Sequence, residues 1–120
     1  MDTKNKELLL KDLNARLPYG VKIELTWWDM GEGTCINTTL EPDHIEQLLN
    51  DEDGDTEIKP YLRPMSSMTD EEKEEYCQLQ QKVVNEDVTK YINYCYKKHF
   101  DVNNLIHMGL AIDATNLNLY

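Results

Sequence analysis

The stretch VKIELTWW, residues 21–28, decides the fold, because its side chains alternate between apolar and polar. The apolar positions are Val21, Ile23, Leu25 and Trp27, and the polar positions between them are Lys22, Glu24 and Thr26. Successive side chains of a strand point to opposite faces of a sheet, so this pattern predicts a half-buried strand. We therefore expect Trp27 in the core and Trp28 on the other face, where a partner could contact it.

Two further strands are predicted beside this one. Residues 29–33, DMGEG, have the composition of a hairpin loop, and residues 34–40, TCINTTL, are a suitable return strand. Residues 56–62, TEIKPYL, also have strand character, and Pro60 favours a place at the sheet edge because proline cannot donate a backbone hydrogen bond. Such an edge could pair across a two-fold axis, although Pro60 would weaken the pairing. Monomer and homodimer therefore both stay open.

Helices are predicted on either side of these strands. Leucines spaced three and four residues apart in residues 5–17, NKELLLKDLNARL, give one apolar helical face, and Pro18 ends the helix. Further helical segments are expected at 42–49, 70–85, 88–99 and 102–107. The sequence thus predicts a single α+β domain over residues 1–120: a small antiparallel sheet, made of the hairpin plus an edge strand, packed against N-terminal and C-terminal helices.

The helix that begins at position 70 has a specific start signal. Thr69 fits a helix N-cap, and Glu72 stands three residues later, where it can complete a capping box. Pro64 precedes this start and favours extended backbone at Arg63. Residues 59–76 are therefore interpreted mainly as a strand-to-helix junction, with Arg63 expected to be exposed beside the acidic helix start.

Composition excludes several classes of function. The chain carries 23 acidic residues against 12 lysines and arginines, a net charge of −11, which disfavours direct binding to nucleic acid. No run of apolar residues is long enough for a membrane span, and the N-terminus MDTKNKELLL does not resemble a signal peptide. The three cysteines are odd in number and form no C-x-x-C pair, which fits a reducing compartment. A cytoplasmic protein is expected.

Metal and catalytic motifs are weak. Asp51, Asp53 and Asp55 alternate as in a calcium-binding loop, but the sixth and twelfth positions hold Thr56 and Leu62 instead of Gly and Glu. Cys95 and His99 are spaced to share a helix face, and Cys77 or His107 could complete a zinc site, yet Cys95 also fits an ordinary apolar stripe. Nucleophile motifs, phosphate-binding loops and dinucleotide fingerprints are absent. The sequence indicates no cofactor, and a non-enzymatic function is favoured.

Acidic residues are concentrated in one segment. Residues 41–57 contain eight acids and no lysine or arginine: Glu41, Asp43, Glu46, Asp51, Glu52, Asp53, Asp55 and Glu57. Such a surface would attract a basic partner and bind it less tightly as salt rises. The alternative is that the charge only keeps a small protein in solution. Asp51, Glu52, Asp53 and Asp55, with Trp28 and Arg63, are the residues expected at a protein interface.

Four phrases of the sequence resemble a loose group of small phage and prophage proteins of gut bacteria. The phrases are KDLNARLPYGVKI (11–23), IEQLLN (45–50), IKPYLRPMSSMTDEE (58–72) and HFDVNNLIHMGLAIDA (99–114). The resemblance implies an origin in a mobile element and a bacterial cytoplasm, and it implies no activity.

Two classes of function remain. The favoured one is a small acidic, non-enzymatic protein that binds a host or phage protein, such as a basic host protein, as an inhibitory or accessory factor. The alternative is a small-ligand or metal-binding domain that uses Cys77, Cys95, His99 or His107.

Overall fold

A computed structural model of the 120-residue chain describes residues 3–29, 31–51, 56–81 and 89–120. The helices and strands follow one another in the order α1 (Thr3–Arg16), β1 (Lys22–Asp29), β2 (Glu32–Thr39), α2 (Pro42–Leu49), β3 (Thr56–Leu62), α3 (Asp70–Gln81), α4 (Thr89–Lys97) and β4 (Ile112–Asp113). Single 3-10 turns lie at Leu17–Tyr19 and Met65–Ser67. The predicted end of the helix at 70–85 and the predicted start of the helix at 88–99 both lie outside the described residues.

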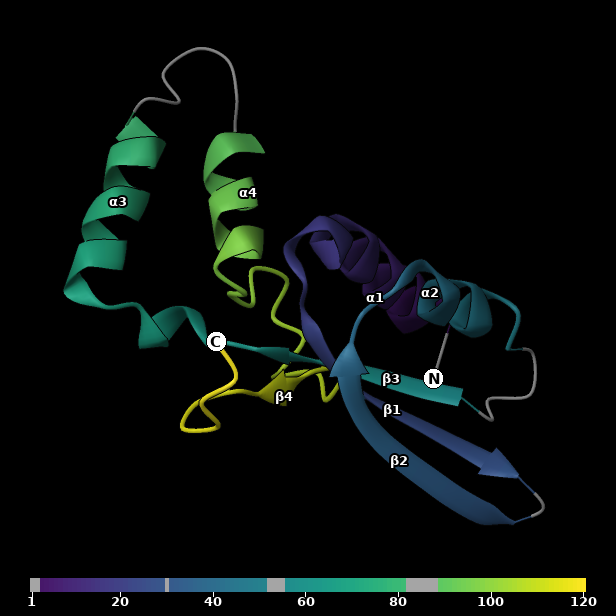
Figure 1. Cartoon of the computed structure of the whole chain (residues 1–120). Coiled ribbons are helices and arrows are strands. Elements are labelled where there is room, and N and C mark those ends of the chain that lie inside the picture. Colours follow the sequence, from purple (N-terminus) through teal and green to yellow (C-terminus); the bar gives the residue numbers. More distant parts are fainter. Residues whose placement is uncertain (1–2, 30, 52–55, 82–88) are drawn as a thin grey trace.

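The strands form one mixed sheet in the order β2-β1-β3-β4 (Figure 1). β1 pairs antiparallel with β2 along its whole length, with Lys22 opposite Thr39 and Asp29 opposite Glu32, so the predicted hairpin is present. β3 pairs antiparallel with the other side of β1. The α+β class is confirmed. The sequence pattern did not reveal β4, a two-residue strand that runs parallel to β3.

β3 is next to the sheet edge rather than at it, and its geometry explains how Pro60 is tolerated. The antiparallel register directs the backbone groups of Glu57 and Lys59 toward β1, so Pro60 presents its missing N–H on the opposite side. On that side β4 begins only opposite Tyr61. Pro60 therefore interrupts no ladder hydrogen bond, which is the physical reason that a proline can occupy this strand.

The helices α1 and α2 cover one face of the sheet (Figure 1). Between them and the sheet lies the main core, whose fully buried members are Leu9, Leu13, Val21, Ile23, Ile58, Leu62 and Leu105. Trp27 packs against this core, whereas Trp28 is 44% exposed, as the alternation along β1 requires. We call the sheet with α1 and α2 the sheet body.

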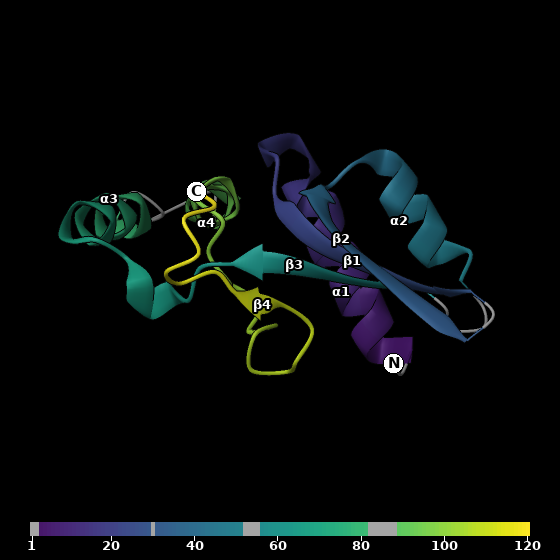
Figure 2. The same cartoon turned by 60° about the horizontal axis from the view of Figure 1, so that its bottom comes forward.

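The helices α3 and α4 pack against each other beyond one end of the sheet, and we call this pair the helical arm (Figure 2). A separate small cluster holds the base of the arm, formed by Met68, Cys95 and Phe100. α4 ends at Lys97, two residues earlier than predicted, because His99 takes a left-handed conformation with φ of 66°. Residues 102–107 form turns instead of the predicted helical segment.

The capping box at the start of α3 is confirmed. The Thr69 N–H donates to Glu72 Oε1 (3.0 Å), and the Glu72 N–H donates to Thr69 Oγ1 (3.1 Å). Two of the four backbone N–H groups that a helix start leaves unpaired are thereby satisfied.

Candidate functional site

An open hollow of about 530 Å³ lies between α2 and the start of β3. The described residues that line it are all polar: Asp43, Glu46, Gln47, Asn50, Asp51 and Thr56. Three of these six side chains carry a carboxylate, and none is basic. The hollow thus gathers three acids of the segment that the sequence singled out, whereas Glu41 and Glu57, which the structure also describes, do not line it.

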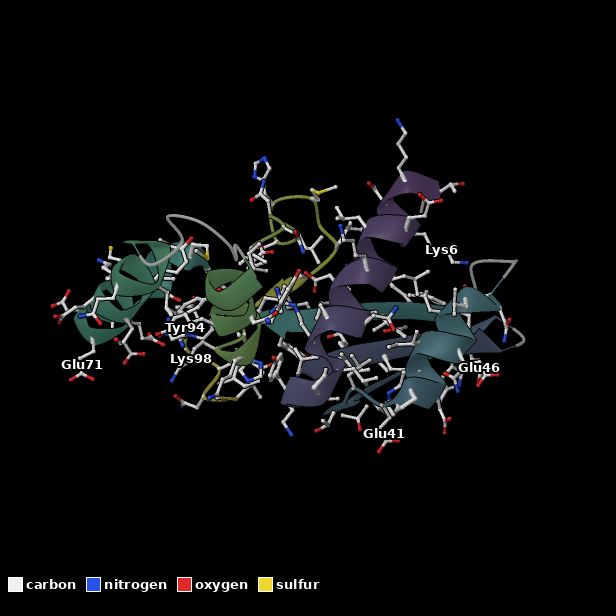
Figure 3. The ribbon with its side chains drawn as sticks, turned by 90° about the horizontal axis from the view of Figure 1, so that it is seen from above. Lys6, Glu41, Glu46, Glu71, Tyr94 and Lys98 are labelled. Carbon is white, nitrogen blue, oxygen red and sulfur yellow. The ribbon has the colours of Figure 1, made fainter. Side chains whose placement is uncertain are left out.

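The local sequence explains why these side chains face outward. Pro42 occupies the first turn of α2, where a missing N–H costs nothing, and the Glu41 N–H donates to His44 Nδ1 (3.0 Å) in a reciprocal cap. Ile45 and Leu48 are buried in the main core and fix the rotation of the helix. Asp43 and Glu46 are then left on the solvent side, where Figure 3 shows Glu46 pointing away from the body of the molecule.

Asp51 connects the lining of the hollow to the start of β3 and to α1 through hydrogen bonds. Its carboxylate accepts a hydrogen bond from the Thr56 N–H (3.2 Å), and its carbonyl accepts one from Lys6 Nζ (3.0 Å) on α1. Lys6 therefore reaches to the end of α2 beside the hollow (Figure 3). Glu52, Asp53 and Asp55, also predicted for the interface, lie outside the described residues.

Trp28, the second part of the predicted interface, lies elsewhere. Its indole sits over Gly33 of β2, close enough that a Cβ on that glycine would come within 3.0 Å of Nε1. The register places Trp28 and Gly33 opposite each other on the face of the sheet that faces away from the core. α2 covers the other face, so Trp28 and the acidic hollow do not form one surface.

Arg63 is not the exposed group that the sequence suggested. Its guanidinium donates to both Glu72 oxygens (2.8 and 2.7 Å) and lies over the Phe100 ring, 4.3 Å from the centroid. The hydrogen bond to Arg63 lowers the pKa of Glu72 to about 2. This pair fastens the start of α3 to the end of β3, and it is a structural contact at the base of the arm.

The cysteines and histidines of the alternative hypothesis differ in how far they are exposed to solvent. Cys95 is fully buried, which raises the pKa of its thiol to about 11, whereas Cys77 and His107 are exposed. The His99 ring stacks on Tyr120 at 3.7 Å, and burial lowers its pKa to about 4. Among the described residues no group of three or more Cys, His, Asp or Glu side chains is placed to hold a metal ion.

Sequence reasoning missed a buried polar network that joins α1 to the segment after α4. Asp12 and Arg16 are both fully buried and form an ion pair one helical turn apart. Arg16 Nη2 donates to the Phe100 carbonyl (2.6 Å), and Asn103 Nδ2 donates to Asp12 (2.8 Å). The only sequence signal was the four-residue spacing of opposite charges, which is also common on exposed helix surfaces.

Comparison of the chain with protein-family models, curated proteins and solved structures found no match. None of the helices in the described part of the chain is long and apolar enough to cross a membrane.

Proposed function

We propose that this protein is a non-enzymatic binding protein, which docks its acidic α2 surface onto a basic surface of another protein. The observation that carries the proposal is the hollow in which Asp43, Glu46 and Asp51 converge around about 530 Å³ of open space. This shape and charge suit the long, cationic side chain of a lysine or arginine from a partner.

The distribution of charge around the hollow supports a basic partner. Among the described residues Lys6 reaches toward it, and its Nζ donates to the carbonyl of Asp51. Lys59, further along β3, is engaged with Glu57 at 3.1 Å. The carboxylates of Asp43 and Glu46 thus keep their negative potential toward solvent, where they can steer a cationic surface toward α2.

A protein that covers a basic surface can change its partner's activity without chemistry of its own. The proposed role is therefore that of an inhibitory or accessory factor. The resemblance of four sequence phrases to phage and prophage proteins favours a host or phage protein as the partner.

The test is a pair of matched double variants used as bait in a bacterial lysate. In Asp43→Asn/Glu46→Gln the two carboxylates of α2 become neutral amides. In Glu71→Gln/Glu74→Gln the same charge is removed from the same two helical positions of α3, at the other end of the molecule (Figure 3). Proteins captured by each bait are identified by mass spectrometry and purified for titration.

We expect the wild type and the α3 variant to capture the same basic protein. The α2 variant should bind it about tenfold more weakly, as two rim charges of up to 1 kcal/mol each would give, and added salt should reduce wild-type affinity toward that of the variant. Equal binding by both variants, or an affinity indifferent to salt, would contradict the proposal.

A further inference from the structure

The strand β2 forms a free edge of the sheet. Within the described residues it pairs with β1 alone, whereas β4 lies at the opposite edge of the sheet. Residues 32–37 are all exposed, so no helix covers this edge over most of its length (Figure 2). A strand of eight residues with one open side is long enough to act as a template for another strand.

The direction of the backbone groups follows from the register. The Leu40 N–H donates to the Val21 carbonyl (2.9 Å), so even-numbered residues of the returning chain direct their N–H and C=O groups toward β1. The odd-numbered residues direct theirs outward. These are Gly33, Cys35, Asn37 and Thr39, which present a regular row of donors and acceptors at the edge.

The sequence of β2 lacks the features that usually prevent edge pairing. EGTCINTT contains no proline, lysine or arginine, and its only charge is Glu32 at the first position. Ile36 is 42% exposed although Leu25, directly opposite on β1, is 5% exposed. The edge therefore combines unpaired backbone groups with an apolar side chain at the middle of the strand.

We propose that β2 pairs antiparallel with β2 of a second copy of this chain, with Ile36 facing Ile36 of that copy on the two-fold axis. Charge selects this occupant. In a molecule with a net charge of −11, β2 is a nearly uncharged strip, so it offers little to a basic partner and little repulsion to an identical strand.

The pairing would be self-complementary. With Ile36 on the axis, Cys35 lies opposite Asn37 of the second copy, and Gly33 lies opposite Thr39. The outward-directed backbone N–H and C=O groups of each pair can then exchange hydrogen bonds. Ile36 occupies the non-hydrogen-bonded position between them, where strands approach most closely, and both Ile36 side chains become buried. The two sheets then form one continuous sheet, and this interface is independent of the α2 hollow.

The first test measures the mass of the full chain by sedimentation equilibrium. We expect a dimer with twice the 14.1 kDa of the chain for the wild type. Ile36→Lys should be a monomer, because the lysine on the axis would face the same lysine of the second copy and the two positive charges would repel. Leu49→Lys, the same kind of change at a 58% exposed position on α2, should remain a dimer. Circular dichroism establishes that both variants are folded.

The second test examines the register in a Cys35→Ser/Cys77→Ser background, which leaves only the buried Cys95. Opposed residues at a non-hydrogen-bonded position lie within disulfide range, so Ile36→Cys should cross-link rapidly on mild oxidation, and Leu49→Cys should not. A wild type that stays monomeric at millimolar concentration, or an Ile36→Lys variant that stays dimeric, would overturn the proposal. A stable dimer in which Ile36→Cys fails to cross-link would overturn this register.

Discussion

The sheet body and the helical arm are stabilised in different ways. Among the described residues the body has a continuous core of thirteen buried side chains from α1, α2, the sheet and its flanking residues, and the segment 105–111. In the described residues the arm has a small buried cluster at its base, formed by Met68, Cys95 and Phe100, with Tyr76 and Tyr94 packed against it. None of the described side chains of α3 is buried. The body can therefore be expected to unfold cooperatively, whereas α3 should depend on its cap and on a few polar contacts.

The two regions are joined by polar groups rather than by a shared apolar core. On the body side, Asp12 and Arg16 of α1 bind Asn103 and the Phe100 carbonyl. On the arm side, Arg63 clamps Glu72 and covers the Phe100 ring. Phe100 thus lies between two arginines. Substitutions at Asp12 and Glu72 test these two contacts, and a substitution at Thr69 tests the local support of α3.

The largest effect is expected from Asp12→Ala. This change leaves the guanidinium of Arg16 buried without its counter-charge, which should lower the free energy of unfolding by about 3–5 kcal/mol in urea titrations. Asp12→Leu/Arg16→Met, which removes both charges, should be more stable than Asp12→Ala. As a control, Glu57→Ala breaks the partly exposed pair with Lys59 and should cost less than about 1 kcal/mol. If Asp12→Ala and Glu57→Ala lowered the free energy of unfolding equally, the buried pair would not be the stronger one.

A smaller effect is expected from Glu72→Gln, which should cost about 2 kcal/mol at neutral pH because it removes a charge-assisted, bidentate contact. The native pKa of Glu72, about 2, lies below its ordinary value of 4.5. Its contribution is therefore fully present above about pH 4.5 and is lost as the pH falls toward 2.

The measurement is the difference in unfolding free energy between wild type and Glu72→Gln across this pH range. Comparing the two proteins at each pH removes the contribution of His99, whose pKa of about 4 falls in the same range. A difference that did not shrink between pH 4.5 and 2 would show that the ion pair with Arg63 is not its source.

The smallest effect is expected from Thr69→Ala, which removes the side-chain half of the capping box and should cost about 1 kcal/mol. Because α3 is supported by few buried contacts, amide exchange should accelerate in α3 and remain unchanged in α1. Thr69→Ser, which keeps the hydroxyl, serves as the control. Uniform acceleration over the whole chain would mean that arm and body unfold as one unit.

Much of the fold was predictable from local patterns. The alternation at 21–28, the leucine spacing of α1 and the Thr69–Glu72 box each depend on residues that are close in sequence, and the structure contains all three. β4 was not predictable, because two residues carry no periodicity and the strand exists only through its pairing with Tyr61 and Leu62. The prediction of a helical segment at 102–107 was wrong. The Asp101 carboxylate accepts hydrogen bonds from the Leu105 and Ile106 N–H groups and holds the segment in a turn.

The candidate site shows the same division. The sequence by itself determined the excess of acid on residues 41–57 and the opposite directions of Trp27 and Trp28, because composition and the two-residue period of a strand are local properties. Only the tertiary structure decided that Trp28 and the acidic hollow lie on different surfaces, that Arg63 is held by Glu72, and that Asp12, Arg16 and Asn103 meet in the interior. Asp12 and Asn103 are 91 positions apart, and no local pattern records which distant side chain will neutralise a buried charge.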